Sequence, residues 1–246
     1  MTVLLSAFRL VVLIAFTVFV STLEILAVPF HRTGKIFHTL ARFHAHGVLA
    51  ISGVKLRTSG TERLDLSRSY VYVANHASYF DIPAVLAGIP QDVRLVYKKE
   101  LEKIPFFGWG LRLGKTYIAI DRRQGTDALS TLDSTAKKIR DGSSVLLFAE
   151  GTRSADGRLQ PFKRGPFNLA ARAGIPVVPV TLLGSHNVLP RNSWKVRSGT
   201  IRLVLDAPIT PPAADGREGE LALRDRVREV ISRHLTHHDE SMIPCP

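Results

Sequence analysis

Cysteine is almost absent from this sequence, in which Cys245 is the single thiol among 246 residues. The chain therefore cannot build a disulfide framework or a zinc site made of cysteines, and the scarcity suits a reducing compartment. With 45% hydrophobic and 22% charged residues, the composition also lacks the bias of a disordered chain or of a protein with many membrane spans. The length fits one globular domain, or one domain with an appendage.

Negative charge is also in short supply, because 21 acidic residues stand against 33 lysines and arginines, for a net charge of +12. A basic chain binds anionic partners such as nucleic acid, an anionic lipid surface or a phosphorylated substrate. Composition does not choose among these partners, and a soluble basic protein fits it as well. No nucleic-acid recognition motif is present, and the apolar N-terminal region argues against that class of partner.

The N-terminal region holds a long apolar run at residues 10–23, which Arg9 and Glu24 enclose. A helix that crosses a bilayer needs about 20 apolar residues, and the run reaches that length only if it continues through Glu24 to Val28. Pro29 then ends it. No small-residue cleavage site of a signal peptide follows. The run therefore predicts either a strained single span or a helix that enters one leaflet.

The next stretch, residues 31–53, mixes basic and apolar side chains in the pattern of an amphipathic helix at a membrane interface. We therefore expect residues 1–53 to form membrane-anchoring helices and residues 54–246 to form a catalytic domain. The expected location is the cytoplasmic face of the inner (plasma) membrane.

From residue 69 onward, strand patterns alternate with helix patterns. This alternation predicts an α/β domain with a mixed, largely parallel sheet flanked by helices. The predicted strands are 70–74, 94–97, 115–120, 144–148, 177–182 and 200–205, and the predicted helices are 83–87, 126–141, 167–173 and 218–235.

Polar clusters follow three of these strands, at residues 75–81, 121–123 and 150–153. Ligands of α/β folds bind at the carboxyl ends of strands, so parallel strands would bring the three clusters to one edge of the sheet.

His76 and Asp81 are the candidate catalytic pair of the first cluster. Histidine suits general-base chemistry near neutral pH, and a carboxylate on its other ring nitrogen fixes the tautomer. A separation of five residues suits a loop histidine and an aspartate in the first turn of a helix, and Pro83 supports a helix start there. On these two residues alone, a loop histidine and a capping aspartate are the commoner explanation.

Ser78 is a rival nucleophile, but no G-x-S-x-G elbow surrounds it. A local helix-capping role suits Ser78 better. The base is therefore expected to activate a hydroxyl on a bound substrate.

The basic residues near these clusters form a candidate anion site. Arg153 offers a planar fork that matches a phosphate group, and Lys98, Arg122 and Lys163 add positive charge. Each of these side chains alone also fits a solvated surface charge.

The motifs of residues 70–205 resemble the glycerolipid acyltransferase family. NHASYFD (75–81) is similar to the family's N-H-x-x-x-x-D motif, and FAEGTRS (148–154) to its F-P-E-G-T-R-S motif. The segments 98–109, 117–122 and 175–184 resemble its remaining motifs, in the family's order. Ala149 stands where the family usually has proline, which predicts a less rigid loop around Glu150.

The resemblance implies that His76, oriented by Asp81, deprotonates the sn-2 hydroxyl of a lysophosphatidate. The oxygen would attack the thioester of acyl-acyl carrier protein or acyl-coenzyme A, so neither a metal nor an organic cofactor is expected. The predicted substrate-binding residues are Asn75, Lys98, Arg122, Glu150, Gly151, Thr152, Arg153 and Lys163.

Two alternatives stay open at this point. The acceptor could instead be glycerol 3-phosphate, another lysophospholipid or a lyso-ornithine lipid, although the basic residues favour an acceptor with a phosphate. The chain could also be a non-catalytic membrane-binding module, which leaves Asn75, His76, Asp81 and Glu150 unexplained.

Overall fold

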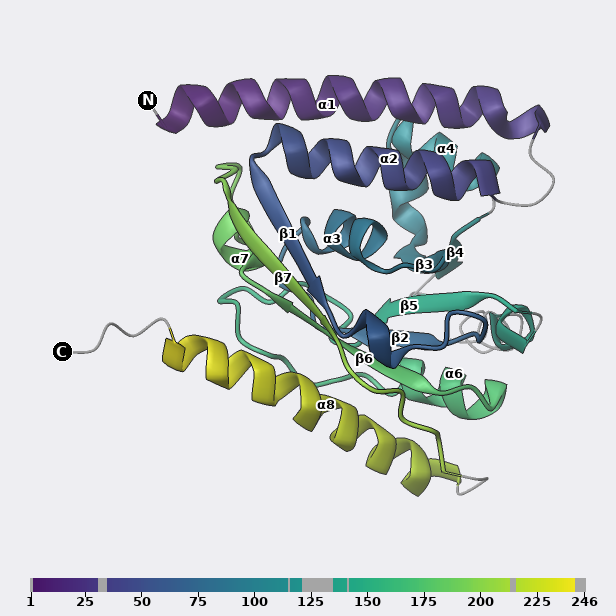
Figure 1. Ribbon diagram of the computed structural model, residues 1–246. Helices are drawn as coiled ribbons and strands as arrows, with labels where there is room; N and C mark the ends of the chain where they lie inside the picture. Colours follow the sequence, from purple (N-terminus) through teal and green to yellow (C-terminus); the bar gives the residue numbers. More distant parts are fainter. Residues whose placement is uncertain are drawn as a thin grey trace.

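A seven-stranded sheet forms the centre of the computed structural model, which describes residues 2–30, 35–114, 116–120, 135–140, 142–212 and 216–241 (Figure 1). Neighbouring strands are parallel except for β6 and β7, which confirms the prediction of a mixed, largely parallel sheet. The strand order is β1-β7-β6-β2-β5-β3-β4, and the bounds are β1 Val54–Ser59, β2 Val71–Ala74, β3 Val93–Lys98, β4 Ile118–Ile120, β5 Ser144–Phe148, β6 Val177–Leu183 and β7 Gly199–Leu205.

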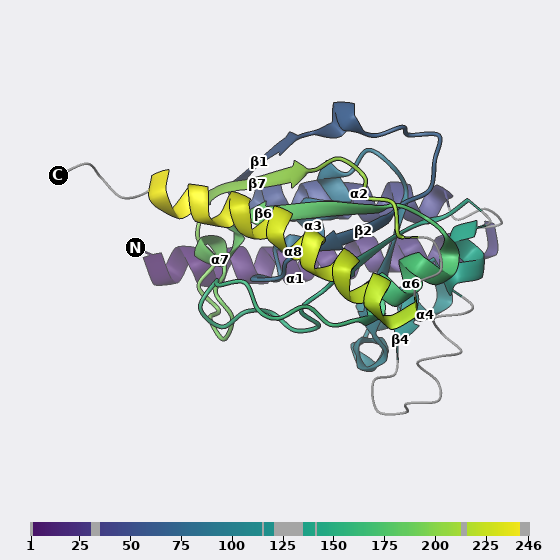
Figure 2. The same cartoon turned by 90° about the horizontal axis from the view of Figure 1, so that it is seen from below.

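Helices cover both faces of this sheet (Figures 1 and 2). In the central strand β2, Tyr72 and Ala74 face a core shared with α2 and α3, while Val71 and Val73 face a core shared with α6 and α8. The remaining helices are η1 Val28–Phe30, α2 Lys35–Ile51, η2 Thr61–Arg63, α3 Asp81–Gly88, η3 Lys99–Lys103, α4 Phe107–Gly114, α6 Gly165–Ala173, α7 Ser185–Val188 and α8 Gly216–Ser241.

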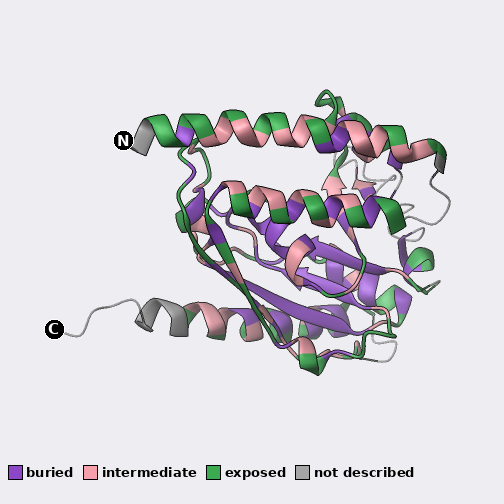
Figure 3. Cartoon of the chain, turned by 45° about the horizontal axis from the view of Figure 1, so that its top comes forward, coloured by how far each residue is buried: buried purple, intermediate pink, exposed green. Residues whose placement is uncertain are grey.

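Helix α1, Thr2–Ala27, lies along the outside of the molecule and packs against α2 and α4 (Figure 1). It is longer than the predicted apolar run and ends before Pro29, because proline lacks the N–H that an α-helix needs. Its residues Leu4–Ala27 are long and apolar enough to cross a membrane, by length and composition. Much of its outer side is exposed (Figure 3).

Helix α2 carries a buried stripe of Phe37, Ala41, Ala45 and Leu49, at the spacing of one helical face. The predicted stretch, of which residues 31–34 lie outside the described part, thus contains an amphipathic helix, but its apolar stripe packs into the protein core, and its contact with a membrane interface stays a prediction. The small alanines allow α2 to approach α3 closely, and both helices share one core with the sheet. The division expected at residue 53 therefore follows chain order, since β1 begins at Val54, and does not separate two cores.

The topology brings two of the predicted polar clusters together. Strands β2 and β5 are parallel neighbours in which Ala74 pairs with Phe148, so the residues that follow both strands emerge side by side. The cluster at residues 121–123 lies outside the described residues, as do residues 126–134 of the predicted helix 126–141, while residues 135–140 are helical.

Candidate active site

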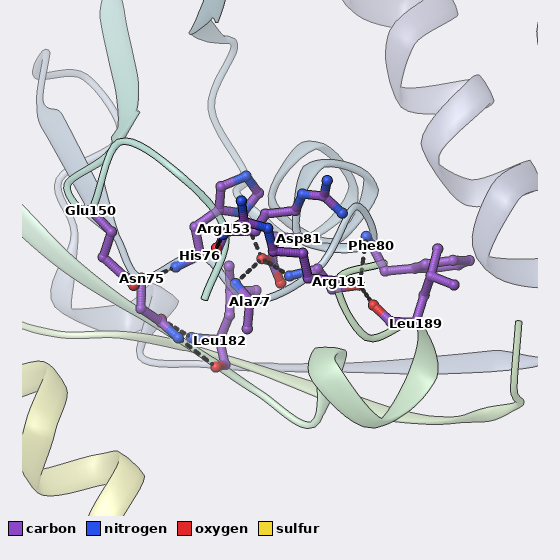
Figure 4. A network of polar contacts seen from close by, with 11 residues as sticks. Asn75, His76, Ala77, Phe80, Asp81, Glu150, Arg153, Leu182, Leu189 and Arg191 are labelled. Carbon is purple, nitrogen blue, oxygen red and sulfur yellow. Dashed lines mark hydrogen bonds and ion pairs between the residues drawn. The ribbon is translucent and has the colours of Figure 1, made fainter. Parts of the chain in front are cut away.

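His76 and Asp81 are in direct contact at the carboxyl end of β2 (Figure 4). His76 lies in the loop after the strand, and Asp81 is the first residue of α3. The histidine Nδ1 is 2.7 Å from the aspartate Oδ2, which also accepts hydrogen bonds from the backbone N–H groups of Ala77 and Ser78, at 2.7 and 2.8 Å. Three donors converge on one oxygen of a carboxylate that is 0% exposed, and this arrangement stabilises its negative charge.

The contact with Asp81 sets the chemistry of the imidazole. Because a carboxylate only accepts hydrogen bonds, Nδ1 carries the proton and the neutral ring presents its lone pair at Nε2. The ring stacks on Phe148 with centroids 4.0 Å apart, and the side chain is 14% exposed. A histidine in this tautomer, which Asp81 orients through Nδ1 and which is partly accessible to solvent, has the geometry of a general base.

Ser78 does not compete for the role of nucleophile. It is fully buried, and its hydroxyl donates to the carbonyl of Leu189 at 2.8 Å and accepts from the N–H of Phe80 at 3.2 Å. The expectation that Ser78 caps the helix is wrong, because the N-cap residue of α3 is Phe80, without a side-chain cap bond. The Ser78 hydroxyl instead ties the histidine loop to the end of α7.

Glu150 connects the histidine loop to the loop that follows β5. Its Oε1 accepts from the backbone N–H of His76 at 2.8 Å, and its Oε2 accepts from the N–H of Gln160 at 3.2 Å. The side chain is buried, and burial raises the pKa of the Glu150 carboxyl to about 7. Both oxygens therefore have partners inside the protein, and a direct contact of Glu150 with substrate stays a prediction.

The turn after Glu150 also holds His76 in place. Gly151 adopts the left-handed conformation with φ of 75°, which residues with a side chain rarely adopt. The turn brings the N–H of Ser154 to the carbonyl of His76 at 2.8 Å. The backbone of His76 is thus fixed on both its N–H and its carbonyl side by one segment, residues 150–154.

Ala149 is held by backbone hydrogen bonds on both sides, and the less rigid loop expected from the missing proline stays a prediction. Its N–H donates to the carbonyl of Ala74 at 3.0 Å, and its carbonyl accepts from the N–H of Lys163 at 2.7 Å. A proline could not make the first bond, because it has no N–H. Alanine therefore extends the hydrogen bonding between β2 and β5 by one residue toward the site.

Arg153 lies beside the histidine loop (Figure 4). Its guanidinium carbon is 3.5 Å from the centroid of the Tyr79 ring, a cation–π contact that orients the side chain. The Arg153 carbonyl accepts a hydrogen bond from Nη1 of Arg191 at 2.8 Å. Sequence reasoning missed Arg191, since a lone arginine in a loop far along the chain carries no signal of this contact.

The other predicted substrate-binding residues differ in their surroundings. Asn75 is buried. Its side-chain amide donates to the carbonyl of Leu182 at 3.0 Å and accepts from the N–H of Leu182 at 2.8 Å, so that it ties β2 to β6.

Lys98, at the end of β3, pairs with Glu100 at 3.2 Å. Thr152 and Lys163 are exposed. Arg122 lies outside the described residues.

An apolar cavity of about 520 Å³ extends from the histidine loop to beneath α1 and α2. Tyr79 and Phe80, which follow the histidine, line it at one side, and α1, α2, α3 and the η3–α4 segment supply most of the remaining wall. Sequence reasoning missed this cavity, because its wall comes from segments far apart in the chain. Representative lining residues are Leu13, Phe37, Leu86, Leu95, Leu111 and Val196.

Comparison with protein families finds a match to the acyltransferase family model over residues 55–183. The chloroplastic 1-acyl-sn-glycerol-3-phosphate acyltransferase BAT2 of Brassica napus is 32% identical over 203 residues, covering 82% of this chain and 56% of the relative. The 1-acyl-sn-glycerol-3-phosphate acyltransferase of Pseudomonas aeruginosa is 32% identical over 189 residues, covering 75% of this chain and 70% of the relative. The chain thus spans about half the length of the chloroplastic relatives and more of the bacterial one.

A similar fold occurs in the crystal structure of the 1-acyl-sn-glycerophosphate acyltransferase PlsC from Thermotoga maritima. The TM-score is 0.78 at 24% sequence identity, and the match covers 96% of each chain. This likeness supports the arrangement of the sheet and of the helices around it, including the N-terminal pair.

Proposed function

The chain belongs to the acyltransferase family, and from this premise we propose that it transfers a fatty acyl chain from a thioester to the sn-2 hydroxyl of a 1-acylglycerol 3-phosphate. The product would be phosphatidic acid. The observation that carries the proposal is the His76–Asp81 pair, held at its backbone by residues 150–154 and placed beside an apolar cavity.

In the proposed reaction, Nε2 of His76 takes the proton of the acceptor hydroxyl while the oxygen of that hydroxyl attacks the thioester carbonyl. The tetrahedral intermediate then collapses, the carbon–sulfur bond breaks, and the imidazolium returns the proton to the leaving thiolate. The buried Asp81 carboxylate would stabilise the imidazolium between the two steps. The products are the new ester and a free thiol, so every atom and proton is accounted for without a metal or an organic cofactor.

Arg153 supports the choice of an acceptor with a phosphate group. Its guanidinium lies over the ring of Tyr79 in the histidine loop, and this contact leaves the N–H groups, which point outward in the guanidinium plane, available to a phosphate. Lys163 adds an exposed positive charge close to Glu150 in the fold, since its N–H bonds the carbonyl of Ala149. We propose that these two cations, with Lys98 and Arg122, hold the phosphate.

The apolar cavity supports a long hydrocarbon chain as the other part of the substrate. Its wall is formed mainly by apolar side chains, and Tyr79 and Phe80 bring it next to the histidine loop. We propose that an acyl chain occupies it during transfer. We further propose that the donor is acyl-acyl carrier protein or acyl-coenzyme A, and that the exposed apolar side of α1 holds the enzyme at a membrane, on the cytoplasmic face of the plasma membrane.

The test is an in vitro transfer assay with labelled acyl-acyl carrier protein and acyl-coenzyme A against a panel of acceptors. We expect transfer to 1-acylglycerol 3-phosphate to exceed transfer to glycerol 3-phosphate, to other lysophospholipids and to a lyso-ornithine lipid. Preference for the lyso-ornithine lipid would contradict the proposed phosphate site. Binding to liposomes without transfer to any acceptor would contradict enzymatic function altogether.

A further inference from the structure

The exposed apolar side chains of the described residues are concentrated on one part of the molecule. All of the large ones except Leu66 and Tyr79 lie on α1, on α2, on the segment from Ile104 to Leu113, or at Trp194. Large exposed apolar surfaces on soluble proteins mark sites of interaction with protein or membrane. Two of the segments that carry these side chains lie outside the N-terminal helices, and each contains a tryptophan.

The first segment contains Trp109, which is 46% exposed. Its ring contacts Phe106, with centroids 5.2 Å apart, and Ile104 and Leu113 are exposed on the same segment. Helix α4 packs against the C-terminal half of α1, because a side chain at Gly110 would meet Glu24 and the carbonyl of Ser21. Trp109 thus lies beside the end of α1 that is near Glu24.

The second segment is the loop before β7, which contains Trp194 at 48% exposed. Val196 in this loop accepts hydrogen bonds at its carbonyl from Oγ of Ser6 at 3.3 Å and from Arg9 at 3.5 Å. The loop is therefore fastened to the N-terminal half of α1. Ser6 and Ser21 are about 22 Å apart along the helix at 1.5 Å per residue, so the two tryptophans flank opposite ends of α1.

Both tryptophan segments contain an unusual backbone conformation. Within the described residues, the non-glycine residues with positive φ are Phe106, at 60°, and Asn192, at 67°. Each lies within three residues of a tryptophan. Such a conformation is costly for a bulky residue such as phenylalanine, and it persists where the surrounding structure enforces it. At Phe106 the fold thus holds an exposed apolar side chain against a local preference, whereas asparagine adopts the conformation of Asn192 more readily.

Exposed cations accompany both tryptophans. Lys103 and Arg112 lie near Trp109 in the chain, and Lys195 and Arg197 lie near Trp194. Tryptophan prefers the membrane–water interface, where its ring is apolar and its N–H stays hydrated, and lysine and arginine beside it attract anionic headgroups. The combination matches an anionic lipid surface better than the surface of another protein.

We propose that the segments of Trp109 and Trp194 are membrane contacts in their own right, which anchor both ends of α1 at the headgroup level of an anionic bilayer. In this arrangement α1 lies along the membrane surface between two aromatic anchors. The wall of the apolar cavity formed by Leu101, Ile104 and Phe107 then faces the lipid. The inference concerns the mode of membrane contact and holds whichever acceptor the enzyme uses.

The chain has two tryptophans, so Trp194→Phe reports on Trp109 alone and Trp109→Phe on Trp194 alone. Each full-length variant is mixed with vesicles of phosphatidylcholine and phosphatidylglycerol that carry bromine on their acyl chains. We expect both emissions to shift to shorter wavelength and to be quenched. Absence of quenching for either tryptophan, in protein that sediments with the vesicles, would overturn the proposal. A shift that follows protein concentration without vesicles would also overturn it, since it indicates a second copy on this surface.

A second set of variants separates binding to anionic headgroups from nonspecific binding through apolar side chains. Lys195→Gln with Arg197→Gln should weaken binding to the anionic vesicles by about thirty-fold and leave binding to pure phosphatidylcholine unchanged. The matched control is Lys137→Gln with Lys138→Gln, which removes two exposed cations next to Ala136, on the sheet face opposite α2. Equal weakening in both double variants would mean that net charge alone drives binding, and would overturn the assignment of the Trp194 segment.

Discussion

The polar side of the candidate site and the apolar cavity beside it are built in different ways. Around His76, individual atoms have individual partners: Asp81 holds the ring, Glu150 holds the backbone N–H, and Ser154 holds the carbonyl. The cavity is lined mostly by apolar side chains, with the hydrogen-bonded Thr17 and His44 among them at 3.0 Å, and is shaped mainly by the packing of α1, α2, α3 and α4. A substitution that changes one atom of the polar side should therefore abolish most of the activity, whereas activity should fall gradually with changes in the volume of the cavity.

The largest effect is expected from Asp81→Asn. An amide cannot accept hydrogen bonds at its nitrogen and stabilises an imidazolium poorly, so we expect a loss of about 10²–10⁴-fold in kcat. Steady-state kinetics with saturating substrates measures it. Ser78→Ala is the control, because it removes a neighbouring buried hydroxyl that has no role in the proposed chemistry, and it should keep kcat within a few-fold. A comparable loss in both variants would mean that loop structure, not the carboxylate, limits the rate.

A smaller effect, confined to substrate binding, is expected from Arg153→Ala. A charge-assisted hydrogen bond contributes about 1.5–3 kcal/mol, so the KM for the phosphate-bearing acceptor should rise by about 10–100-fold with little change in kcat. Arg158→Ala is the matched control, since it removes an exposed arginine from the same loop. An unchanged KM in Arg153→Ala would reassign this residue to structure.

Glu150→Gln tests the polar side of the site through the pH dependence of the free energy of unfolding. Because burial raises the pKa of Glu150 to about 7 from 4.5, its contribution to folding is fully present below pH 4.5 and is lost as the pH rises through 7. Relative to Glu150→Gln, the free energy of unfolding of the wild type should therefore fall by on the order of 1–3 kcal/mol as the pH rises through this window. Denaturant unfolding at a series of pH values measures it. Parallel pH profiles for the two proteins would mean that Glu150 titrates as an exposed carboxyl does.

The most gradual effect is expected on the apolar side, from Val48→Phe. Val48 lines the cavity from α2 and is only partly buried, and a larger side chain there reduces the space for a hydrocarbon chain. We expect kcat/KM for the longest donors to fall by about ten-fold, as for a loss of about 1.4 kcal/mol, while short donors react normally. A panel of donors with increasing chain length measures it. A uniform loss for all chain lengths would show that the cavity does not hold the acyl chain.

The same contrast explains how much of the fold and site could be predicted from the sequence. His76, Asp81 and Glu150 lie within a few residues of buried strands, and parallel pairing of β2 with β5 necessarily brings such residues together. Strand β1 was missed because only its first residue is buried, which leaves little apolar signal in an edge strand. At Ala149 the expectation considered the missing proline ring and not the N–H gained, which donates to the carbonyl of Ala74.

The tertiary contacts of the site could not be predicted in the same way. The pairing of Asn75 with Leu182 and of Arg153 with Arg191 joins residues far apart in the chain, through backbone groups that every residue possesses. The positions of α1 and α2 depend in part on glycines, since a side chain at Gly47 of α2 would collide with Phe16 of α1, and one at Gly114 of α4 would collide with Phe37 of α2. Such fits are properties of packed surfaces and leave no periodic pattern in the sequence.

The most direct test is single-turnover transfer of a labelled acyl chain to 1-acylglycerol 3-phosphate by the wild type and by His76→Ala, bound to the same vesicles in equal amounts. We predict that the variant folds and binds the vesicles as the wild type does, and that its transfer rate is lower by at least about 10²-fold. Transfer within a few-fold of the wild-type rate would show that another group removes the acceptor's proton.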